Sequence, residues 1–390
     1  MSGGVNVHIT HIPFKNQARI WKETKSLADL NVFKKISVVS LEKERPSKII
    51  ENIEHLEIFR VYLKSREIKN IFFRRLFAYP EFIWRVYQQF KNEKVACINA
   101  HSLLTLPLAS ALKWRTGAEL IYDTHELETE TSGLSSVTKV FARLLETLFV
   151  RSAKAIFVVS QSIAGAYHRM YPAIPVFVVR NIPRKSQFSP GTSARLKSML
   201  GLTAETLLFL YQGGLEPKRG IEVTLQAFET VSSDRHLVFL GDGSLNHLVQ
   251  NHVLRFKNIH HLPAVPYKDL AEFTKGADVG LVLYDDVCLN HKYCLPNKIF
   301  EYCLTGLPAI VTPLLELKQL IHQYQMGWVL PNRSNELSNF INLVNREEIA
   351  RVRVNMLKAS RDLSWEQEEE VIKVFYGDLF GAEDRRVNTG

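Results

Sequence analysis

The stretch CLNHKYCLPNKIFEYCLTGLPAIVT, residues 288–312, decides the fold. Within it, Pro296 precedes a helical pattern that starts at Asn297, and Gly306 ends that pattern before the next apolar run. Proline suits the first turn of a helix and glycine suits its end. The free N–H groups and the dipole at such a helix start bind anions. Glu301 lies one turn further along the same face, where a carboxylate can accept hydrogen bonds from a ribose diol.

Taken alone, the stretch also fits a plain helix in which Asn297 is a cap and Glu301 is a solvated side chain. Two glycine turns in the same half of the chain favour the interpretation as a binding site over the plain helix. The segment YQGGLEPKRGIE, residues 211–222, follows one apolar run, and LGDGS, residues 240–244, ends another. Glycines let a phosphate approach the backbone, arginine offers a bidentate fork, and ligands of open α/β sheets bind at the carboxyl ends of strands. The candidates are Gly213, Gly214, Arg219, Gly241 and Gly243.

Short apolar runs alternate with amphipathic stretches through both halves of the chain. This alternation is typical of parallel sheets covered by helices on both faces. A segment rich in Pro, Ser and Gly, residues 181–193, separates the two series. We therefore predict an α/β protein with two doubly wound Rossmann-like domains, residues 1–184 and 185–363, and a last helix within residues 364–390.

The composition is that of a globular protein, with 46% hydrophobic and 23% charged residues in 390. No apolar run is long enough to span a bilayer, and the N-terminus lacks the pattern of a signal peptide. A cytoplasmic location is therefore expected. The four cysteines form no CxxC pair and have no histidine at zinc-finger spacing, so neither a structural metal nor a disulfide framework is predicted.

Taken in order, the glycine turns, the segment HLPAVPYKDLAEFTKGADVGLVLY (261–284) and the stretch 288–312 resemble the donor-binding domain of family 4 (GT4) glycosyltransferases, especially the sequences with an LPNKxFEY segment. The first half adds IYDTHELETE (121–130) and VVSQS (158–162). The resemblance implies a GT-B fold, in which two Rossmann-like domains face a central cleft and the last helix crosses back to the first domain.

The same resemblance implies an activity. The enzyme would move a sugar from a nucleotide-sugar donor, a UDP-sugar, to a glycan or lipid-linked acceptor in cell-surface polysaccharide or glycoconjugate biosynthesis. Transfer would be retaining and would need no metal and no other cofactor.

The family also implies roles by position. Arg219 and Lys298 would hold the donor diphosphate, and His125 would face the donor sugar, although a histidine there also fits a neighbour of a helix cap. The predicted catalytic set is Arg219, Lys298 and His125. The predicted donor-binding set is Gly213, Gly214, Gly241, Gly243, Val265, Tyr267, Pro296, Asn297 and Glu301.

Three departures from the family pattern affect the prediction. Tyr293 stands where relatives carry the glutamate that contacts the donor sugar, so the sugar is left open. Gly214 replaces a frequent phosphate-binding arginine. The segment PFKNQ, residues 13–17, replaces a glycine-rich loop, and we assign Lys15 and Asn16, with His101, to the acceptor side.

Residues 60–91 are basic and aromatic. They hold eight Lys and Arg against two Glu, interleaved with Phe, Tyr and Trp. This pattern fits an amphipathic element on an anionic membrane, with Arg74, Arg75 and Arg85 on lipid headgroups, which would place the protein at the inner face of the membrane. The alternative is that the aromatic residues pack on the sheet and the cations are solvated. No nucleic-acid module accompanies the stretch, so nucleic acid is not a predicted partner.

Two other functions compete with the transferase. One is a nucleotide-sugar epimerase of the same fold, which would need acid and base side chains on the sugar. The other is a non-catalytic scaffold or partner subunit at a membrane surface. An oxidoreductase is disfavoured because no GxGxxG follows the first strand.

Overall fold

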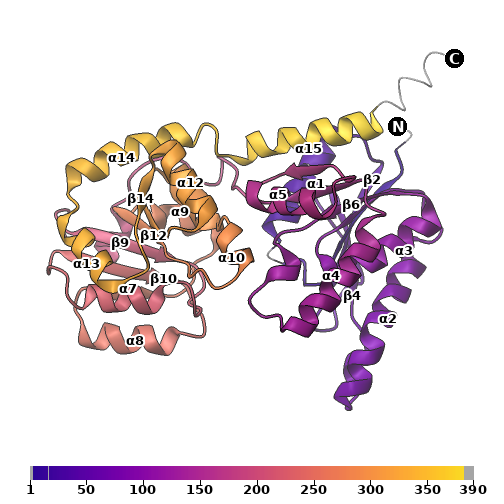
Figure 1. Cartoon of the computed structure of the whole chain (residues 1–390), viewed down its shortest axis with the longest axis horizontal. Helices are drawn as coiled ribbons and strands as arrows, with labels where there is room; N and C mark the ends of the chain where they lie inside the picture. Colours follow the sequence, from indigo (N-terminus) through magenta and orange to yellow (C-terminus); the bar gives the residue numbers. More distant parts are fainter. Residues whose placement is uncertain (1–2, 16, 382–390) are drawn as a thin grey trace. The chain divides into compact units, whose positions relative to one another are not determined.

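The computed structural model describes residues 3–15 and 17–381, without the side chain of Arg75. These residues form two compact units (Figure 1). The first comprises the chain up to Val179 and the residues from Glu368 onward, and the second is Arg180–Gln367. The division therefore lies at 179/180, whereas the linker composition suggested 184/185. Asn16 lies outside the described residues.

The first unit is built on an eight-stranded sheet with the order β3-β4-β2-β1-β5-β6-β7-β8. All neighbouring strands are parallel except the antiparallel pair β3 and β4. The strands are β1 (Val5–Thr10), β2 (Lys35–Leu41), β3 (Ile50–Ile53), β4 (Leu56–Val61), β5 (Val95–Ala100), β6 (Glu119–Asp123), β7 (Ala155–Val158) and β8 (Val176–Val178).

The second unit is built on a six-stranded, wholly parallel sheet with the order β11-β10-β9-β12-β13-β14. Its strands are β9 (Leu207–Gln212), β10 (Arg235–Leu240), β11 (Ile259–Leu262), β12 (Val279–Val282), β13 (Ala309–Val311) and β14 (Gly327–Val329).

Helices flank both sheets (Figure 1). Those of the first unit are α1 (Ala18–Leu30), η1 (Lys64–Glu67), α2 (Ile71–Phe90), η2 (Leu103–Thr105), α3 (Leu106–Thr116), η3 (Glu128–Glu130), α4 (Ser136–Val150) and α5 (Gln161–Met170). Those of the second are α6 (Arg195–Met199), α7 (Ile221–Phe228), α8 (Asn246–Arg255), α9 (Tyr267–Thr274), α10 (Leu289–Tyr293), α11 (Asn297–Thr305), α12 (Leu315–Tyr324), α13 (Ser334–Leu343) and α14 (Arg346–Ala359). Helix α15 (Trp365–Phe380) begins in the second unit and continues in the first.

Strand β9 shows how the second unit buries both faces of its sheet. Leu208 and Leu210 belong to one hydrophobic core, whereas Leu207, Phe209 and Tyr211 belong to another on the opposite face. Alternate residues of a strand point to opposite faces, so an uninterrupted apolar strand requires cover on both sides. The predicted α/β fold with two doubly wound domains is confirmed.

Candidate functional site

The loops after β9 and β10 are held together by glycines. Gly213 has φ 107° and Gly241 has φ 148°, which side-chain-bearing residues rarely adopt. A Cβ on Gly241 would lie 2.1 Å from the Gly213 carbonyl oxygen. The Gly213 N–H donates to the Leu240 carbonyl at 2.9 Å, and the Leu215 N–H donates to that of Asp242 at 3.0 Å. The two predicted glycine turns thus form one continuous edge at the carboxyl ends of adjacent strands.

Two cations face this edge. A Cβ on Gly213 would lie 3.2 Å from Cε of Lys298, and one on Gly214 would lie 3.1 Å from Nη1 of Arg219. The ring of Tyr284 lies near both, with its centroid 5.7 Å from the Arg219 Cζ and 5.6 Å from the Lys298 Nζ. Bare glycine backbone opposite two basic side chains can accommodate a phosphate group.

Lys298 is buried in the second unit. Its side chain starts in the first turn of α11, and its Nζ lies 3.7 Å from the centre of the Tyr211 ring. Within the described part of the chain this Nζ has no hydrogen-bond partner. Burial, together with the neighbouring charge of Arg219, lowers the pKa of Lys298 to about 7, although Glu301 opposes the shift. An anion would supply the missing partner and restore the charged form.

Glu301 is positioned from two sides. It lies on α11 and is only 6% exposed. Gln212, the last residue of β9, donates from Nε2 to its Oε2 at 2.5 Å, and the hydroxyl of Thr274 donates to the amide oxygen of Gln212 at 2.8 Å. Burial raises the pKa of Tyr267, and the charge of Glu301 adds to that shift. The carboxylate is therefore fixed in orientation and lies close to Lys298.

The remaining donor-side candidates lie around these groups. Pro296 precedes α11 without a side-chain cap, and Asn297 is exposed in its first turn. Gly243 is packed against the backbone of the loop after β9, where a Cβ would lie 2.3 Å from the Leu215 carbonyl oxygen. Val265 lies in the loop after β11 and packs on the core. The predicted helix bounds at Asn297 and Gly306 match α11, which ends at Gly306 with φ 79°.

A separate buried network lies in the first unit, at the carboxyl ends of β5 and β6. His101 Nδ1 lies 2.9 Å from Oδ2 of Asp123, and His125 Nε2 lies 3.3 Å from the same oxygen. Arg19 binds both oxygens of this carboxylate, at 2.7 and 3.0 Å. His8 Nδ1 lies 2.8 Å from Nε2 of His101. His125, with about a third of its side chain exposed, is the most accessible histidine of this network.

The charges in this network compensate one another. Burial would raise the pKa of Asp123, but the charges of Arg19 and His125 and the contacts with the histidines hold it well below its usual range. Burial lowers the pKa of His101, and that of His8 more strongly. An ionised carboxylate therefore orients the neutral ring of His101.

The other first-unit candidates lie apart from this network in the described structure. Lys15 is exposed in the turn after β1. Arg74 and Arg85 belong to α2, where Arg85 donates to Oε1 of Glu81 at 2.8 Å. Arg75 is on the same helix.

Family comparisons decide the identity. The glycosyl transferase 4-like domain family matches residues 50–181, and the glycosyl transferases group 1 family matches residues 206–345. The chain is a GT4-type glycosyltransferase of the GT-B fold. No curated protein sequence matches it significantly.

Solved glycosyltransferases share the fold of this one. Sucrose-phosphate synthase from Thermosynechococcus elongatus is 17% identical, with a TM-score of 0.79 over 97% of this chain and all of its own. HepE from Anabaena, in complex with UDP and glucose, is 15% identical, with a TM-score of 0.71 over 96% of this chain and all of its own. WaaG, a glycosyltransferase involved in lipopolysaccharide biosynthesis, is 14% identical, with a TM-score of 0.64 over 94% of this chain and 98% of its own.

Four residues of this glycosyltransferase's sites were not selected from the sequence. Asp123 stands in the quoted segment 121–130, two residues before His125, and its position at a strand end was the available signal. Gln212 similarly ends β9 beside the glycine pair. Arg19 and His8 gave no signal, because their role depends on packing between elements distant in sequence.

Two groups in the first unit have the donor atoms of a metal site: His8, Glu23 and His101, and His101, Asp123 and His125. Within each, the potential ligand atoms lie within 4.8 Å of one another. In the second group, both histidines already contact the Asp123 carboxylate. Arg19 also donates a hydrogen bond to this carboxylate. The geometry of the second group is therefore accounted for by these contacts.

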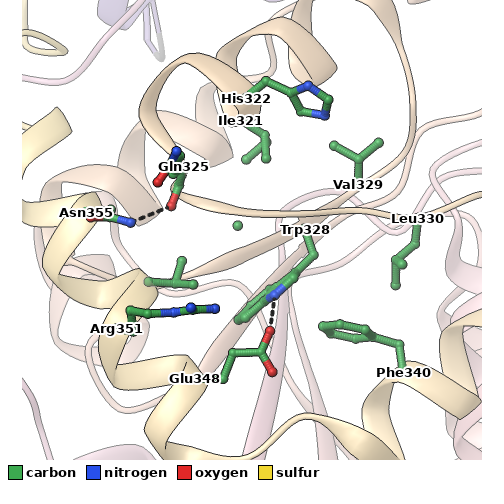
Figure 2. Close-up of a pocket in the computed structure, with 12 residues that line it drawn as sticks. Ile321, His322, Gln325, Trp328, Val329, Leu330, Phe340, Glu348, Arg351 and Asn355 are labelled. Atoms are coloured by element: carbon green, nitrogen blue, oxygen red, sulfur yellow. Dashed lines mark hydrogen bonds between the residues drawn. The ribbon is translucent and has the colours of Figure 1, made fainter.

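A cavity of about 690 Å³ lies beside the edge strand β14, lined by residues of α12, β14, α13 and α14 (Figure 2). Trp328 Nε1 donates to Oε1 of Glu348 at 2.8 Å, and Asn355 Nδ2 donates to the Gln325 carbonyl at 3.1 Å. None of the predicted site residues of the glycosyltransferase lines this cavity.

Proposed function

We propose that this enzyme transfers a sugar from a UDP-sugar to a glycan or lipid-linked acceptor, with retention of anomeric configuration and without a metal. The observation that carries the proposal is the edge formed by Gly213 and Gly214, which faces Lys298 and Arg219 and lies close to the fixed carboxylate of Glu301. The glycines admit the diphosphate, the cations offset its charge, and the carboxylate accepts from the ribose hydroxyls. HepE, a structure of the same fold, is in complex with UDP and glucose.

The proposed role of the two cations is catalytic as well as binding. As the bond from the sugar to the phosphate breaks, negative charge grows on the leaving diphosphate. Cations already in position for that charge lower the barrier more than they strengthen substrate binding. In this scheme the departing phosphate accepts the proton of the acceptor hydroxyl, so transfer on the same face needs no separate base.

His125 is proposed to contact the donor sugar. Its Nε2 contact with Asp123, 3.3 Å, fixes the ring and leaves Nδ1 as the other polar atom. We also propose that the chain belongs to the subgroup with an LPNKxFEY segment and that its donor carries UDP. The proposed pathway is cell-surface polysaccharide or glycoconjugate biosynthesis.

A nucleotide-sugar panel tests it. Thermal shift with UDP, GDP and their sugars should show the largest rise in the midpoint for one UDP-sugar, because a ligand of the folded state stabilises it. Incubation of that donor with lipid-linked and soluble glycans, followed by NMR of the product, should show the donor's anomeric configuration. Formation of an isomerised sugar in the absence of an acceptor would contradict the proposal and would indicate an epimerase. Absence of nucleotide binding would also contradict the proposal and would indicate a non-catalytic scaffold.

A further inference from the structure

Helix α4 turns an apolar face toward solvent. Its exposed apolar side chains are between 65% and 79% accessible; they are Val137, Val140, Phe141, Leu144 and Leu148. Their spacing of three or four residues, with Val140 and Phe141 adjacent, puts all of them on one side of the helix. Soluble monomers rarely expose a contiguous apolar stripe of this kind, which marks an interaction surface.

The opposite side of α4 packs against the fold and buries Glu146 and Val150. Glu146 is fully buried there. Its Oε1 accepts the hydroxyls of Tyr122 at 3.0 Å and Tyr167 at 2.7 Å, and its Oε2 accepts that of Tyr171 at 3.2 Å. Rotating the helix to hide its apolar side would break these bonds and leave a buried carboxylate unpaired, which is costly. The exposed face of α4 is thus fixed by the structure.

The first half of α2 presents a second apolar face. Its exposed side chains are Ile71, Phe72, Phe73, Leu76 and Phe77, whereas Phe82 and Phe90 in the second half are buried. In the second half Trp84 is exposed, so apolar exposure is concentrated in the first half but is not confined to it. Figure 1 shows one end of α2 extending past the other elements of its unit.

Helix α3 lies between these faces and joins them. It packs against both α2 and α4. Trp114 of α3 is 70% exposed, and its ring centroid lies 6.3 Å from that of Phe149 of α4. On α2, Tyr79 donates its hydroxyl to the Leu104 carbonyl at 2.8 Å, which ties this helix to η2, the turn directly before α3. The apolar side chains of the three helices therefore belong to one region of the first unit.

Among the described residues, the unpaired positive charge of this region lies on the exposed half of α2, because Lys139 and Arg143 of α4 form ion pairs with Glu130 of η3. Residues 68–80, which include the exposed half of α2, hold Lys69, Arg74 and Arg75 and no acidic residue. The only acidic residue of α4 is Glu146, which is buried. Apolar side chains that insert between acyl chains, with cations at the level of anionic headgroups, are the pattern of a helix lying in a membrane interface.

We propose that α2 and α4 together form a docking face for an anionic lipid bilayer, defined by the ten exposed side chains named above for these helices. Pairing of two copies through this face would bring the cations of both α2 helices together, so a dimer is disfavoured. The face lies on the bilayer rather than crossing it, because no helix of the described residues combines the length and apolarity of a membrane span. The α4 half goes beyond the proposed function and does not depend on it.

Vesicle co-sedimentation tests the proposal. The full chain is mixed with phosphatidylcholine vesicles, with or without phosphatidylglycerol. We expect binding only when the anionic lipid is present. The variant V140S/L144S on α4 and the variant F72S/F77S on α2 should each weaken binding by about tenfold or more, since each removes two large apolar contacts. Arg74→Glu should weaken it by about fivefold or more.

The matched control is Leu254→Ser on α8, an 85% exposed leucine of the second unit, which should bind vesicles like the parent. UDP binding should be unchanged in every variant, so failure of the docking face and failure of the donor site are distinguishable. If V140S/L144S binds as tightly as the parent, α4 is not part of the face. If light scattering shows a lipid-free dimer that V140S/L144S dissociates, the occupant is a second copy and the proposal is wrong.

Discussion

In the first unit the buried cation Arg19 has a bidentate carboxylate partner in Asp123, whereas in the second unit the buried amine of Lys298 has no hydrogen-bond partner among the described residues. The pKa values follow this difference. The Asp123 carboxyl has a pKa far below its usual range because of Arg19 and the histidines, and Lys298 has its pKa lowered to about 7 by burial. A satisfied network fixes geometry, while an unsatisfied cation at a glycine edge is prepared for an anion that the protein itself lacks.

Asp123→Ala should produce the largest change, because it breaks the satisfied network. It leaves Arg19 without its bidentate partner, and removal of one member of a buried ion pair costs about 3–5 kcal/mol of the free energy of unfolding. Glu23, whose Oε1 lies 2.9 Å from Nε of Arg19, limits the loss to the lower end of that range. Urea unfolding of the first unit, followed by tryptophan fluorescence, measures the effect.

The control for this change is Lys25→Ala, which removes the exposed ion pair of Lys25 with Asp29 on the same helix. Exposed pairs contribute under about 1 kcal/mol, so its midpoint should barely move. Equal destabilisation by both variants would mean that Asp123 is not the anchor described above.

Lys298→Met should have the next largest effect, on function rather than on folding. Methionine keeps the packing on Tyr211 and removes the amine. Loss of one preorganised group that stabilises transition-state charge lowers kcat by about 10²–10³-fold. Turnover of the UDP-sugar selected by thermal shift measures it, with Lys292→Met on the exposed surface of α10 as the matched control. Unchanged turnover in Lys298→Met would remove the lysine from the mechanism.

The contrast between the units also explains what could be predicted from the sequence. The apolar runs indicated most strands of both sheets, because buried parallel strands are apolar on both faces. The hairpin of β3 and β4 was missed, since Ile50–Ile53 alternates with polar residues at a sheet edge. On the donor side, glycines and cations sit in short local motifs, so Gly213 and Lys298 were found.

The network of the first unit follows different rules. Arg19, His8 and Asp123 lie on three different elements. The hydrogen bond between Arg19 and Asp123 joins residues that are 104 positions apart in the sequence. Only the fold brings them together, so no local pattern marks Arg19 or His8, and Asp123 offers only its position at a strand end. The apolar face of α4 was missed for a related reason: periodicity showed that the helix is amphipathic but did not show which side faces the sheet. The buried Glu146 reverses the usual orientation.

The affinity for UDP should fall as pH rises above 7. In the free protein Lys298 has a pKa of about 7, and a bound diphosphate stabilises the ammonium form and so raises that pKa. Binding above pH 7 therefore takes up a proton. Affinity declines by up to about tenfold per pH unit until the pKa of the complex is reached. Calorimetry between pH 7 and 9, in buffers of different ionisation enthalpy, measures both the affinity and the proton uptake.

Lys298→Met is the control for this pH dependence and should show neither the slope nor the proton uptake. A parent protein whose affinity is constant from pH 7 to 9 would show that the lysine is already charged without ligand. In that case Lys298 of the second unit would resemble Arg19 of the first unit, whose charge is compensated within the protein.

The smallest change is expected from Gln212→Leu, which tests whether Glu301 owes its orientation to β9. The amide of Gln212 donates to the carboxylate and accepts from Thr274, so leucine removes the bond that fixes Glu301 without changing either cation. Loss of one hydrogen bond to a charged group corresponds to about 1.5–3 kcal/mol, and retention of the carboxylate itself should keep the effect near the lower end, about a tenfold loss of UDP affinity. Inorganic pyrophosphate has no ribose, so its affinity should stay unchanged in the variant. An equal loss for both ligands would mean that Gln212 supports the phosphate edge rather than the carboxylate, and Glu301 would then lose its proposed role at the ribose.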